Sequence, residues 1–588
     1  MDDQALRTLT AAWIEGDPDP ETQRELTALI AAGALDEVKA RMTPPLVFGT
    51  AGLRARVGAG AARMNRATVI RATRGLADFL GTRSGARSLP VVVGRDARTS
   101  SERFATDVCS VLAAAKIPVR YFAEPVPTPL VAYAARVLAA TAGIVITASH
   151  NPRDDNGYKL YLDDAVQLTA PHDSAIERAI ERVGPAASVP RVDFQANAAV
   201  PTPWQSELEA LDVNAWFERY LTEVLAQLGP HEGGPLRIAY TPLHGVGWRF
   251  AARALARAGY TDVRVVPEQA QPDGAFPTTP FPNPEEPQTL ELALAFAANE
   301  GADVLIANDP DADRLAVAVP TPSGRWQRLT GNQLAALFAD ARIPAVSPGA
   351  PPHALPLVTT SIVTTPLVEA IARSRGARVE RTLTGFKWLW TAMLALERRG
   401  AGRFAYACEE ALGYSLTPAV RDKDGIAAAV ALADLAARCR KNGQSLLDRL
   451  NVIAREFGVW ASAQHNVAIA GRPVAEAVSG VLDRAASPAF TSLGARAIAG
   501  VHDYRRATAA SPPWLSAAPL VELELQGGRV LLRPSGTEPK LKLYVDLRAE
   551  PTSGGSSSAL EAALTREAGE LARELVEKLG LVSENAAP

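Results

Sequence analysis

The sequence predicts an α/β protein built from repeated strand–loop–helix units and closed by a smaller α+β domain. Short apolar runs end in polar or glycine-rich loops, and alanine-rich helical patterns follow those loops. This rhythm is typical of α/β units with largely parallel sheets. From about residue 459 onward, β-type runs such as VELELQ and KLKLYVDL dominate instead. Open α/β sheets bind ligands at the loops that follow their strands, so each such loop is a candidate site.

The elements follow one another in a regular order. The predicted strands are residues 89–93, 142–147, 236–240, 303–307 and 357–360. The predicted helices are residues 108–113, 248–258, 367–374 and 560–579. The chain is divided by connectors rich in Pro and Gly near residues 228–235 and 347–356. A further division lies near residue 459, where β-type runs replace the strand–loop–helix pattern. The expected domains are 1–228 with a serine loop, 229–346 with an acidic loop, 347–457 with a Glu-Glu loop and 458–588 with an Arg-Ser-Gly-Thr loop.

Composition limits the classes of partner. The 588 residues correspond to roughly four domains of about 150 residues. Hydrophobic residues make up 47% and charged residues 21%, which excludes a disordered chain. With 61 Lys and Arg against 64 Asp and Glu, no overall field favours nucleic acid or an anionic membrane. Three widely spaced cysteines give neither a disulfide framework nor a zinc site. We therefore expect a cytoplasmic protein without nucleic-acid or membrane partners.

Three alternating carboxylates form the first motif, NDPDADR. Asp309, Asp311 and Asp313 follow an apolar run and can converge on one hard divalent cation. Without a cation, packing three like charges together is costly. A calcium EF-hand is excluded because Arg314 and Pro320 occupy its required Gly and Glu positions. A phosphatase of the haloacid-dehalogenase type, with Asp309 as nucleophile, stays open as a rival.

A serine loop, TASHNP, forms the second motif at residues 147–152. Ser149 follows an apolar run, and we expect it to be exposed and able to accept or donate a phosphoryl group. Lys159 supplies a nearby cation. The alternative is an ordinary turn, because Asn-Pro favours turn initiation.

Two further loops carry groups that bind sugars and phosphates. In RPSGTEPK, Arg533 can form bidentate bonds to phosphate, and the Ser-Gly-Thr turn adds hydroxyl and backbone donors. In CEEALGYS, Glu409 and Glu410 can accept hydrogen bonds from sugar hydroxyls. The alternatives are a β-turn with surface charges and a solvated acidic face. A Gly-Val-Gly at 245–247 lacks the third glycine of a dinucleotide fingerprint, so it indicates a tight strand-to-helix turn.

Taken together and in this order, these loops resemble the α-D-phosphohexomutase family, which includes phosphoglucomutases and phosphomannomutases. The resemblance runs from about residue 47 to 545. It is carried by FGTAGLR (48–54), TASHNP, DNGYK (155–159), DPDADR (309–314), TGFKW (384–388), EEALGY (409–414), VRDKDG (420–425) and RPSGTEPK (533–540). AGLR, DNGYK, FPTTPFPNPEEP (276–287) and TGFKW also resemble the branch that includes phosphoglucomutase 2-type enzymes and phosphopentomutases.

The resemblance implies an architecture and a set of site residues. The fold would be four domains around a central cleft, three similar α/β domains and a smaller α+β C-terminal domain. Ser149 would be a phosphoserine and would bind one Mg²⁺ per chain together with Asp309, Asp311 and Asp313. Arg54, His150 and Lys159 would line the reacting centre. The substrate would be bound by Arg314, Lys387, Glu410, Arg533, Ser535, Gly536 and Thr537.

The resemblance also implies an activity. The protein would be a phosphotransferase isomerase that interconverts sugar 1-phosphates and 6-phosphates, glucose phosphates first, through a bisphosphorylated sugar. Glucose 1,6-bisphosphate would be its activator. Ala411 and Leu412 follow Glu410 where the family often has a serine, which leaves the preferred sugar open. The alternatives are a phosphomannomutase, a phosphopentomutase acting on ribose 1-phosphate and ribose 5-phosphate, a sugar phosphatase, or a noncatalytic sugar-phosphate sensor.

Overall fold

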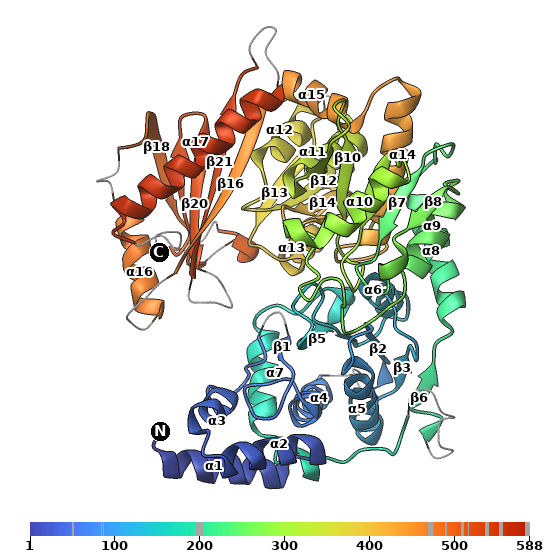
Figure 1. Cartoon of the computed structure of the whole chain (residues 1–588), viewed down its shortest axis with the longest axis vertical. Helices are drawn as coiled ribbons and strands as arrows, with labels where there is room; N and C mark the ends of the chain where they lie inside the picture. The colour runs from blue at the N-terminus through green and yellow to red at the C-terminus, as the bar shows by residue number, and fades with distance from the viewer. Residues whose placement is uncertain are drawn as a thin grey trace. The chain divides into compact units, whose positions relative to one another are not determined.

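The computed structural model forms two compact units, coloured along the chain in Figure 1. The first comprises Met1–Leu329 and Gly413–Arg438, and the second comprises Thr330–Leu412 and Cys439–Pro588. The structure describes residues 1–49, 52–83, 85, 88–195, 204–347, 349–468, 474–487, 491–506, 511–515, 517–534, 540–551 and 557–581.

The first sheet of the first unit has the order β1-β5-β4-β2-β3-β6. Its strands are β1 (Leu53–Arg56), β5 (Asp155–Tyr161), β4 (Ala142–Ile146), β2 (Val91–Arg95), β3 (Val119–Tyr121) and β6 (Leu208–Ala210). The central strands are parallel, whereas β5 runs antiparallel to both β1 and β4. The strands β2 and β4 are buried along their whole length because helices pack on the sheet.

Helices cover this sheet and extend it at the N-terminus. They are α1 (Asp3–Gly16), α2 (Pro20–Ala31), α3 (Leu35–Met42), α4 (Arg66–Gly81), α5 (Ser101–Ala114), α6 (Thr128–Val137) and α7 (His172–Glu181). The helix α4 begins where the Asn65 side chain accepts the Thr68 N–H at 2.9 Å, a favourable N-cap. The first three helices share a small core that includes Leu26, Val38 and Met42.

The second sheet of the first unit has the order β11-β10-β9-β7-β8. Its strands are β11 (Trp326–Leu329), β10 (Ala316–Pro320), β9 (Val304–Ala307), β7 (Ile238–Thr241) and β8 (Val263–Val265). The pairs β7–β8 and β7–β9 are parallel, and β10 is antiparallel to both of its neighbours. The first unit also includes α8 (Val213–Leu228), α9 (Gly247–Arg257), α10 (Glu291–Asn299), β15 (Gly413–Ser415) and most of α14 (Gly425–Lys441).

The second unit contains a parallel sheet and an antiparallel one. The parallel strands are β13 (Arg378–Thr382), β12 (Pro356–Ser361) and β14 (Arg403–Glu409), with α11 (Gly331–Arg342), α12 (Pro366–Ser374), α13 (Phe386–Arg398) and α15 (Leu446–Phe457). The antiparallel order is β16 (Val459–Ala468), β21 (Lys540–Ala549), β20 (Gly528–Pro534), β19 (Val521–Leu525), β18 (Arg496–Asp503) and β17 (Ser492–Leu493). Its core also includes residues of α16 (Val474–Ala485) and α17 (Ser557–Lys578), and α17 lies across one face of the sheet (Figure 1).

Each of the five predicted strands coincides with an observed strand, namely β2, β4, β7, β9 and β12. The predicted change to a β-rich α+β region near residue 459 coincides with the start of β16. The domain boundaries at 228, 346 and 457 stay a prediction. None of the described helices combines the length and the apolar content needed to cross a membrane.

Candidate functional site

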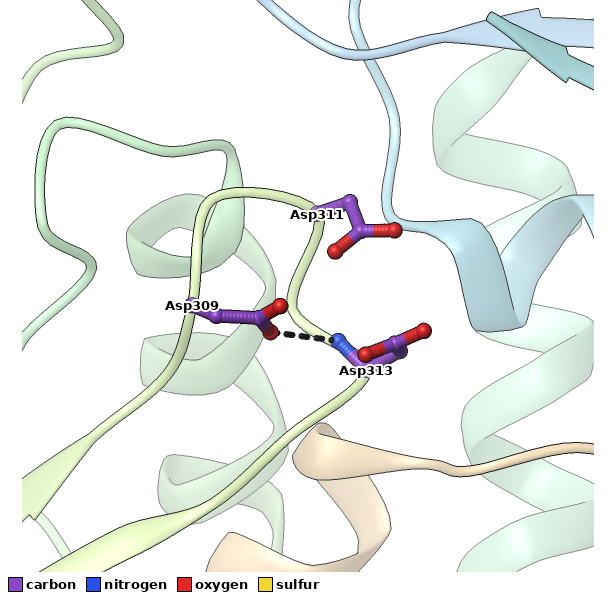
Figure 2. Close-up of side chains that lie close together, drawn as sticks. All are labelled: Asp309, Asp311 and Asp313. Atoms are coloured by element: carbon purple, nitrogen blue, oxygen red, sulfur yellow. Dashed lines mark hydrogen bonds between the residues drawn. The ribbon is translucent and has the colours of Figure 1, made fainter. Parts of the chain in front are cut away.

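The three aspartates of the acidic loop converge on one point. Asp309, Asp311 and Asp313 lie on the turn between β9 and β10, and one carboxylate oxygen from each lies within 4.8 Å of the others. All three are buried. Figure 2 shows their side chains close together on this loop. Ala312 has a φ of +56°, and the Asp313 N–H donates to Asp309 Oδ1 at 3.1 Å, so the turn bends back on itself. Because of this bend, alternate side chains share one side of the loop.

Two lysines balance part of this negative charge. Lys159 Nζ lies 3.2 Å from Asp311 Oδ2 and 2.9 Å from Asp313 Oδ2, and Lys423 Nζ lies 3.2 Å from Asp313 Oδ2. Against the cost of burial, these lysines lower the pKa of Asp313. Burial, and then the charges of Asp311 and Asp313, raise the pKa of Asp309 well above its ordinary value. The cluster therefore still favours a further positive charge.

The donor set fits a hard cation. Asp311 Oδ1 and Asp313 Oδ1 are buried, and neither has a hydrogen-bond partner among the residues that the structure describes. A buried acceptor left without a partner is costly. Carboxylate oxygens are the ligands that Mg²⁺ prefers, so the three aspartates fit a magnesium ion better than an empty acidic turn.

Ser149 lies beside this cluster. Its Oγ donates to Asp309 Oδ2 at 2.6 Å, and His150 Nδ1 lies 3.2 Å from the same Oγ. The expectation of an exposed serine is wrong, because Ser149 is only 3% exposed. The loop that follows β4 contacts the acidic loop that follows β9, and a contact between two sheets is not visible in local sequence. The residue also has a left-handed backbone, with a φ of +51°.

Further predicted residues gather around Ser149 in the first unit. Arg54 Nη1 donates to Asn151 Oδ1 at 3.0 Å. Arg314 is paired with Glu285 at 2.9 Å, and its Nη2 lies 3.5 Å from His150 Nε2. Arginine has only donors, so His150 Nε2 is the acceptor of this contact. Partial burial, and then the charges of Arg314 and Arg54, lower the pKa of His150 well below its ordinary value.

The remaining predicted residues belong to the second unit. Glu410 directly follows β14, and its Oε2 accepts from Ser361 Oγ at 2.9 Å. Lys387 lies in the first turn of α13. Arg533 lies near the end of β20 and donates from Nη2 to the Tyr544 hydroxyl at 3.0 Å. Ser535, Gly536 and Thr537 lie outside the described residues.

Sequence reasoning gave no role to two residues at the acidic loop. Lys423 belongs to VRDKDG, about 110 residues from Asp313 in sequence. The neighbouring Asp422 accepts from the Tyr161 hydroxyl at 2.6 Å, which anchors the segment. Thr128 Oγ1 donates to Asp311 Oδ2 at 2.7 Å. A basic residue between two aspartates was the available signal for Lys423, and no local pattern distinguishes Thr128.

Comparison with known proteins identifies the family. Models of the phosphoglucomutase/phosphomannomutase α/β/α domains I, II and III and of the C-terminal domain match residues 45–186, 218–324, 330–455 and 507–551. They confirm the predicted four-domain α/β architecture.

Relatives are similar over almost the whole chain. Mouse phosphopentomutase and mouse glucose 1,6-bisphosphate synthase are each 34% identical over 571 residues, covering 93% of this chain and 91% of each relative. Phosphoribomutase of Saccharomyces cerevisiae is 33% identical over 591 residues, with 92% of both chains covered.

Solved structures share the fold. A phosphoglucomutase/phosphomannomutase family protein from Burkholderia thailandensis has a TM-score of 0.65 at 20% identity, covering 91% of this chain and 98% of that one. The open form of pp63/parafusin (phosphoglucomutase) from Paramecium has a TM-score of 0.68 at 17% identity, covering 92% and 97%. With four matching domains in order, the chain belongs to the phosphoglucomutase/phosphomannomutase (α-D-phosphohexomutase) family and is a phosphosugar mutase, an isomerase that acts by phosphoryl transfer.

Proposed function

We propose that this enzyme interconverts sugar 1-phosphates and 6-phosphates through a phosphoserine at Ser149, with glucose 1-phosphate and glucose 6-phosphate as the first substrate pair. The observation that carries the proposal is the 2.6 Å contact between Ser149 Oγ and Asp309, inside a cluster of buried carboxylates. A phosphomonoester resists nucleophiles because of its negative charge, so its transfer depends on positioning and charge neutralisation. The cluster positions Ser149 Oγ, and the cation that it would hold would supply the positive charge.

In the first step, the phosphoryl group leaves Ser149 Oγ for the free hydroxyl of the sugar phosphate. The new O–P bond forms as the Oγ–P bond breaks, and the hydroxyl proton ends on Ser149 Oγ, so no further reactant is consumed. His150 Nε2 accepts from Arg314, so its neutral ring carries the proton on Nδ1, 3.2 Å from Oγ. We assign His150 as the donor that stabilises Oγ while the phosphoryl group leaves.

The aspartates and the phosphoserine would hold one Mg²⁺, which supplies positive charge that offsets the charge of the moving phosphoryl group. Lys159 and Lys423 hold the carboxylates from the protein side. Arg54 donates a hydrogen bond to Asn151 of the serine loop. These side chains keep the reacting oxygen fixed, which is the main contribution that a protein makes to phosphoryl transfer.

Residues of the second unit would bind the rest of the substrate. Glu410 would accept hydrogen bonds from sugar hydroxyls, and Lys387 would contact the sugar. Arg533 with Ser535, Gly536 and Thr537 would bind the phosphate that is not being transferred. The bisphosphorylated sugar would turn end for end and return its other phosphoryl group to Ser149. Glucose 1,6-bisphosphate would activate the enzyme by phosphorylating a free Ser149.

A second substrate pair is ribose 1-phosphate and ribose 5-phosphate. It is favoured by relatives named phosphopentomutase and phosphoribomutase that are similar over nine tenths of the chain. Ala411 and Leu412, which follow Glu410, offer no side-chain hydroxyl to the sugar. Mannose 1-phosphate belongs in the same comparison.

The test is a panel of glucose, mannose and ribose 1-phosphates with Mg²⁺ and a trace of the matching bisphosphate, followed by ³¹P NMR. We expect isomerisation, and a fall of several orders of magnitude in S149A while substrate binding persists in calorimetry. Absence of isomerisation with every sugar contradicts the proposal. Phosphate release that survives S149A indicates a phosphatase, and ligand-induced stabilisation without turnover indicates a sensor.

A further inference from the structure

Arg98 is a buried arginine in the segment between β2 and α5. It is 3% exposed, and its guanidinium is bonded to the backbone of the serine loop. Nη2 donates to the carbonyl oxygens of Ser149 (2.8 Å) and Asn151 (2.6 Å). Nη1 donates to those of Pro152 (2.7 Å) and Asp155 (2.9 Å). One planar group thus fixes four carbonyls within seven residues, a geometry that the rigid fork of arginine suits.

Asp96 connects Arg98 to Ser149 by a second route. The Arg98 Nε lies 3.3 Å from Asp96 Oδ2, and the Arg98 N–H donates to Oδ1 at 3.0 Å. Thr147 Oγ1 donates to Asp96 Oδ2 at 2.7 Å and accepts the Ser149 N–H at 2.8 Å. The Ser149 carbonyl therefore bonds directly to Arg98, and the Ser149 N–H is connected to Asp96 through the Thr147 hydroxyl.

The burial of this ion pair indicates that it fixes the conformation of the serine loop and adds little net stability. Arg98 and Asp96 have side chains that are each 1% exposed, and a buried ion pair is a weak source of net stability because desolvation offsets the attraction. Ser149 has a φ of +51°, which is costly for a residue other than glycine and persists only where the surroundings enforce it. The bonds from Arg98 and Thr147 are the contacts that enforce it.

The same arginine also orders a second group of the site. Asn151 gives its carbonyl to Arg98, while its side-chain oxygen accepts from Arg54 Nη1 at 3.0 Å. Asn151 is therefore fixed by Arg98 and in turn positions Arg54. Ser149, in the loop after β4, and Arg54, on β1, are thus both positioned through Arg98.

We propose that Arg98 is a positioning residue for phosphoryl transfer: it fixes Ser149 Oγ against Asp309 and, through Asn151, sets the place of Arg54. This inference rests on the proposed role of Ser149 as the phosphoryl carrier. Arg98 contacts the loop backbone, Asp96 and the Phe276 ring, and we infer that its effect reaches the reaction through the groups that it orders. Loss of the planar guanidinium of Arg98 should lower kcat and leave the Michaelis constant nearly unchanged.

The experiment compares R98K with R95K. Lysine keeps the charge but lacks the planar fork, and a displacement of the reacting oxygen of about 1 Å lowers kcat by roughly 100-fold. Arg95 is a matched control on β2, 7% exposed, which donates to the Ala123 carbonyl at 3.1 Å and pairs with Glu102. We expect similar losses of melting temperature in both variants, with the fall in kcat confined to R98K.

A milder variant covers the case in which R98K does not fold. T147V removes the hydroxyl that connects Asp96 to the Ser149 N–H, and we expect kcat to fall about tenfold, the effect of one lost hydrogen bond. The inference is overturned if R98K has a normal kcat, or if kcat falls equally in R98K and R95K. If R98K cannot be assayed, a normal kcat in T147V overturns it. S149A is assayed in parallel. If S149A stays active, the proposed function itself is wrong, whereas an inactive S149A with a fully active R98K overturns only the role of Arg98.

Discussion

Asp311 and Asp313 each keep one buried carboxylate oxygen without a hydrogen-bond partner among the described residues. An unmade bond at a buried acceptor costs about 1–3 kcal/mol, and more when the group is charged. Lys159 satisfies only the other oxygen of each carboxylate. A cation that takes both orphan oxygens would recover this cost, so metal affinity should depend strongly on each aspartate.

The first prediction concerns Asp311. In D311N the side chain keeps its size but loses its charge, and we expect Mg²⁺ affinity to fall roughly tenfold or more in isothermal titration calorimetry. D303N is the control. Asp303 immediately precedes β9 and accepts a hydrogen bond from the Arg237 backbone N–H, so the D303N substitution should leave Mg²⁺ affinity unchanged. Equal affinity in D311N and the parent protein would show that this carboxylate does not bind the metal.

A second prediction concerns pH and Asp424. Burial raises the pKa of Asp424 to about 6, although hydrogen bonds from the Ala427 N–H and the Tyr220 hydroxyl partly oppose the rise, and Asp313 adds to it. The folded state therefore holds this proton at pH values where the unfolded state has lost it. The stability that Asp424 contributes is fully present below the unfolded pKa and is lost as pH rises through about 6.

D424N removes this titration and keeps an oxygen that can cap α14. The melting temperature of D424N relative to the parent protein should rise as pH increases from about 4 to about 7. Differential scanning calorimetry at several pH values measures this difference. Parallel pH profiles for the two proteins would contradict the assigned shift. D303N, measured in the same series, controls for the loss of one carboxylate in the first unit.

The acidic loop packs against the turn between β7 and α9. In this turn Leu243 and His244 have φ values of +50° and +59°, and the Val246 N–H donates to the Pro310 carbonyl at 2.9 Å. A Cβ atom on Gly245 would lie 2.3 Å from Pro310 Cα. The two backbones are in direct contact here, so a displacement of one loop must displace the other.

The third prediction follows from that contact. G245A has no room for its methyl group, so the acidic loop must shift, and overpacking of this kind costs typically 1–3 kcal/mol. We expect a lower melting temperature together with weaker Mg²⁺ binding. G569A is the control, because its Cβ would meet only Arg573 Nη1 at 3.9 Å on α17, where alanine favours the helix. A G245A variant as stable as G569A would contradict the packing argument.

Much of the element order was predictable because buried parallel strands are short apolar runs. The strand β1 escaped prediction because LRAR is half charged, and β5 because DNGYKLY opens with polar residues. Lys159 is 5% exposed inside β5, and its charge is balanced there by Asp311 and Asp313 from the turn between β9 and β10. The loop motifs thus named the candidate residues, whereas the burial of Ser149 and the role of Lys423 depend on contacts between distant segments.

The candidate residues divide between the two units. The serine, the acidic loop and Lys423 belong to the first, whereas Glu410, Lys387 and Arg533 belong to the second. A ligand stabilises the segments that it contacts in the folded state. Mg²⁺ and the sugar should therefore slow hydrogen exchange in different segments of the chain.

The fourth prediction is that Mg²⁺ alone slows hydrogen exchange in the loops at residues 147–159, 308–314 and 420–425 of the first unit, and leaves the second unit unchanged. Hydrogen–deuterium exchange with mass spectrometry, with and without EDTA, measures this effect. D311N should lose the protection. Equal protection of both units would show that the metal effect is not local to the acidic cluster.

The first unit is not one continuous stretch of chain, because Gly413–Arg438 follows Thr330–Leu412, the first segment of the second unit. During synthesis, Lys423 therefore emerges about 110 residues after Asp313, a delay of roughly 5 to 20 seconds at ordinary elongation rates. Throughout that interval the nascent acidic loop has Lys159 but lacks Lys423. The segment that completes its charge balance is thus the last part of the first unit to leave the ribosome.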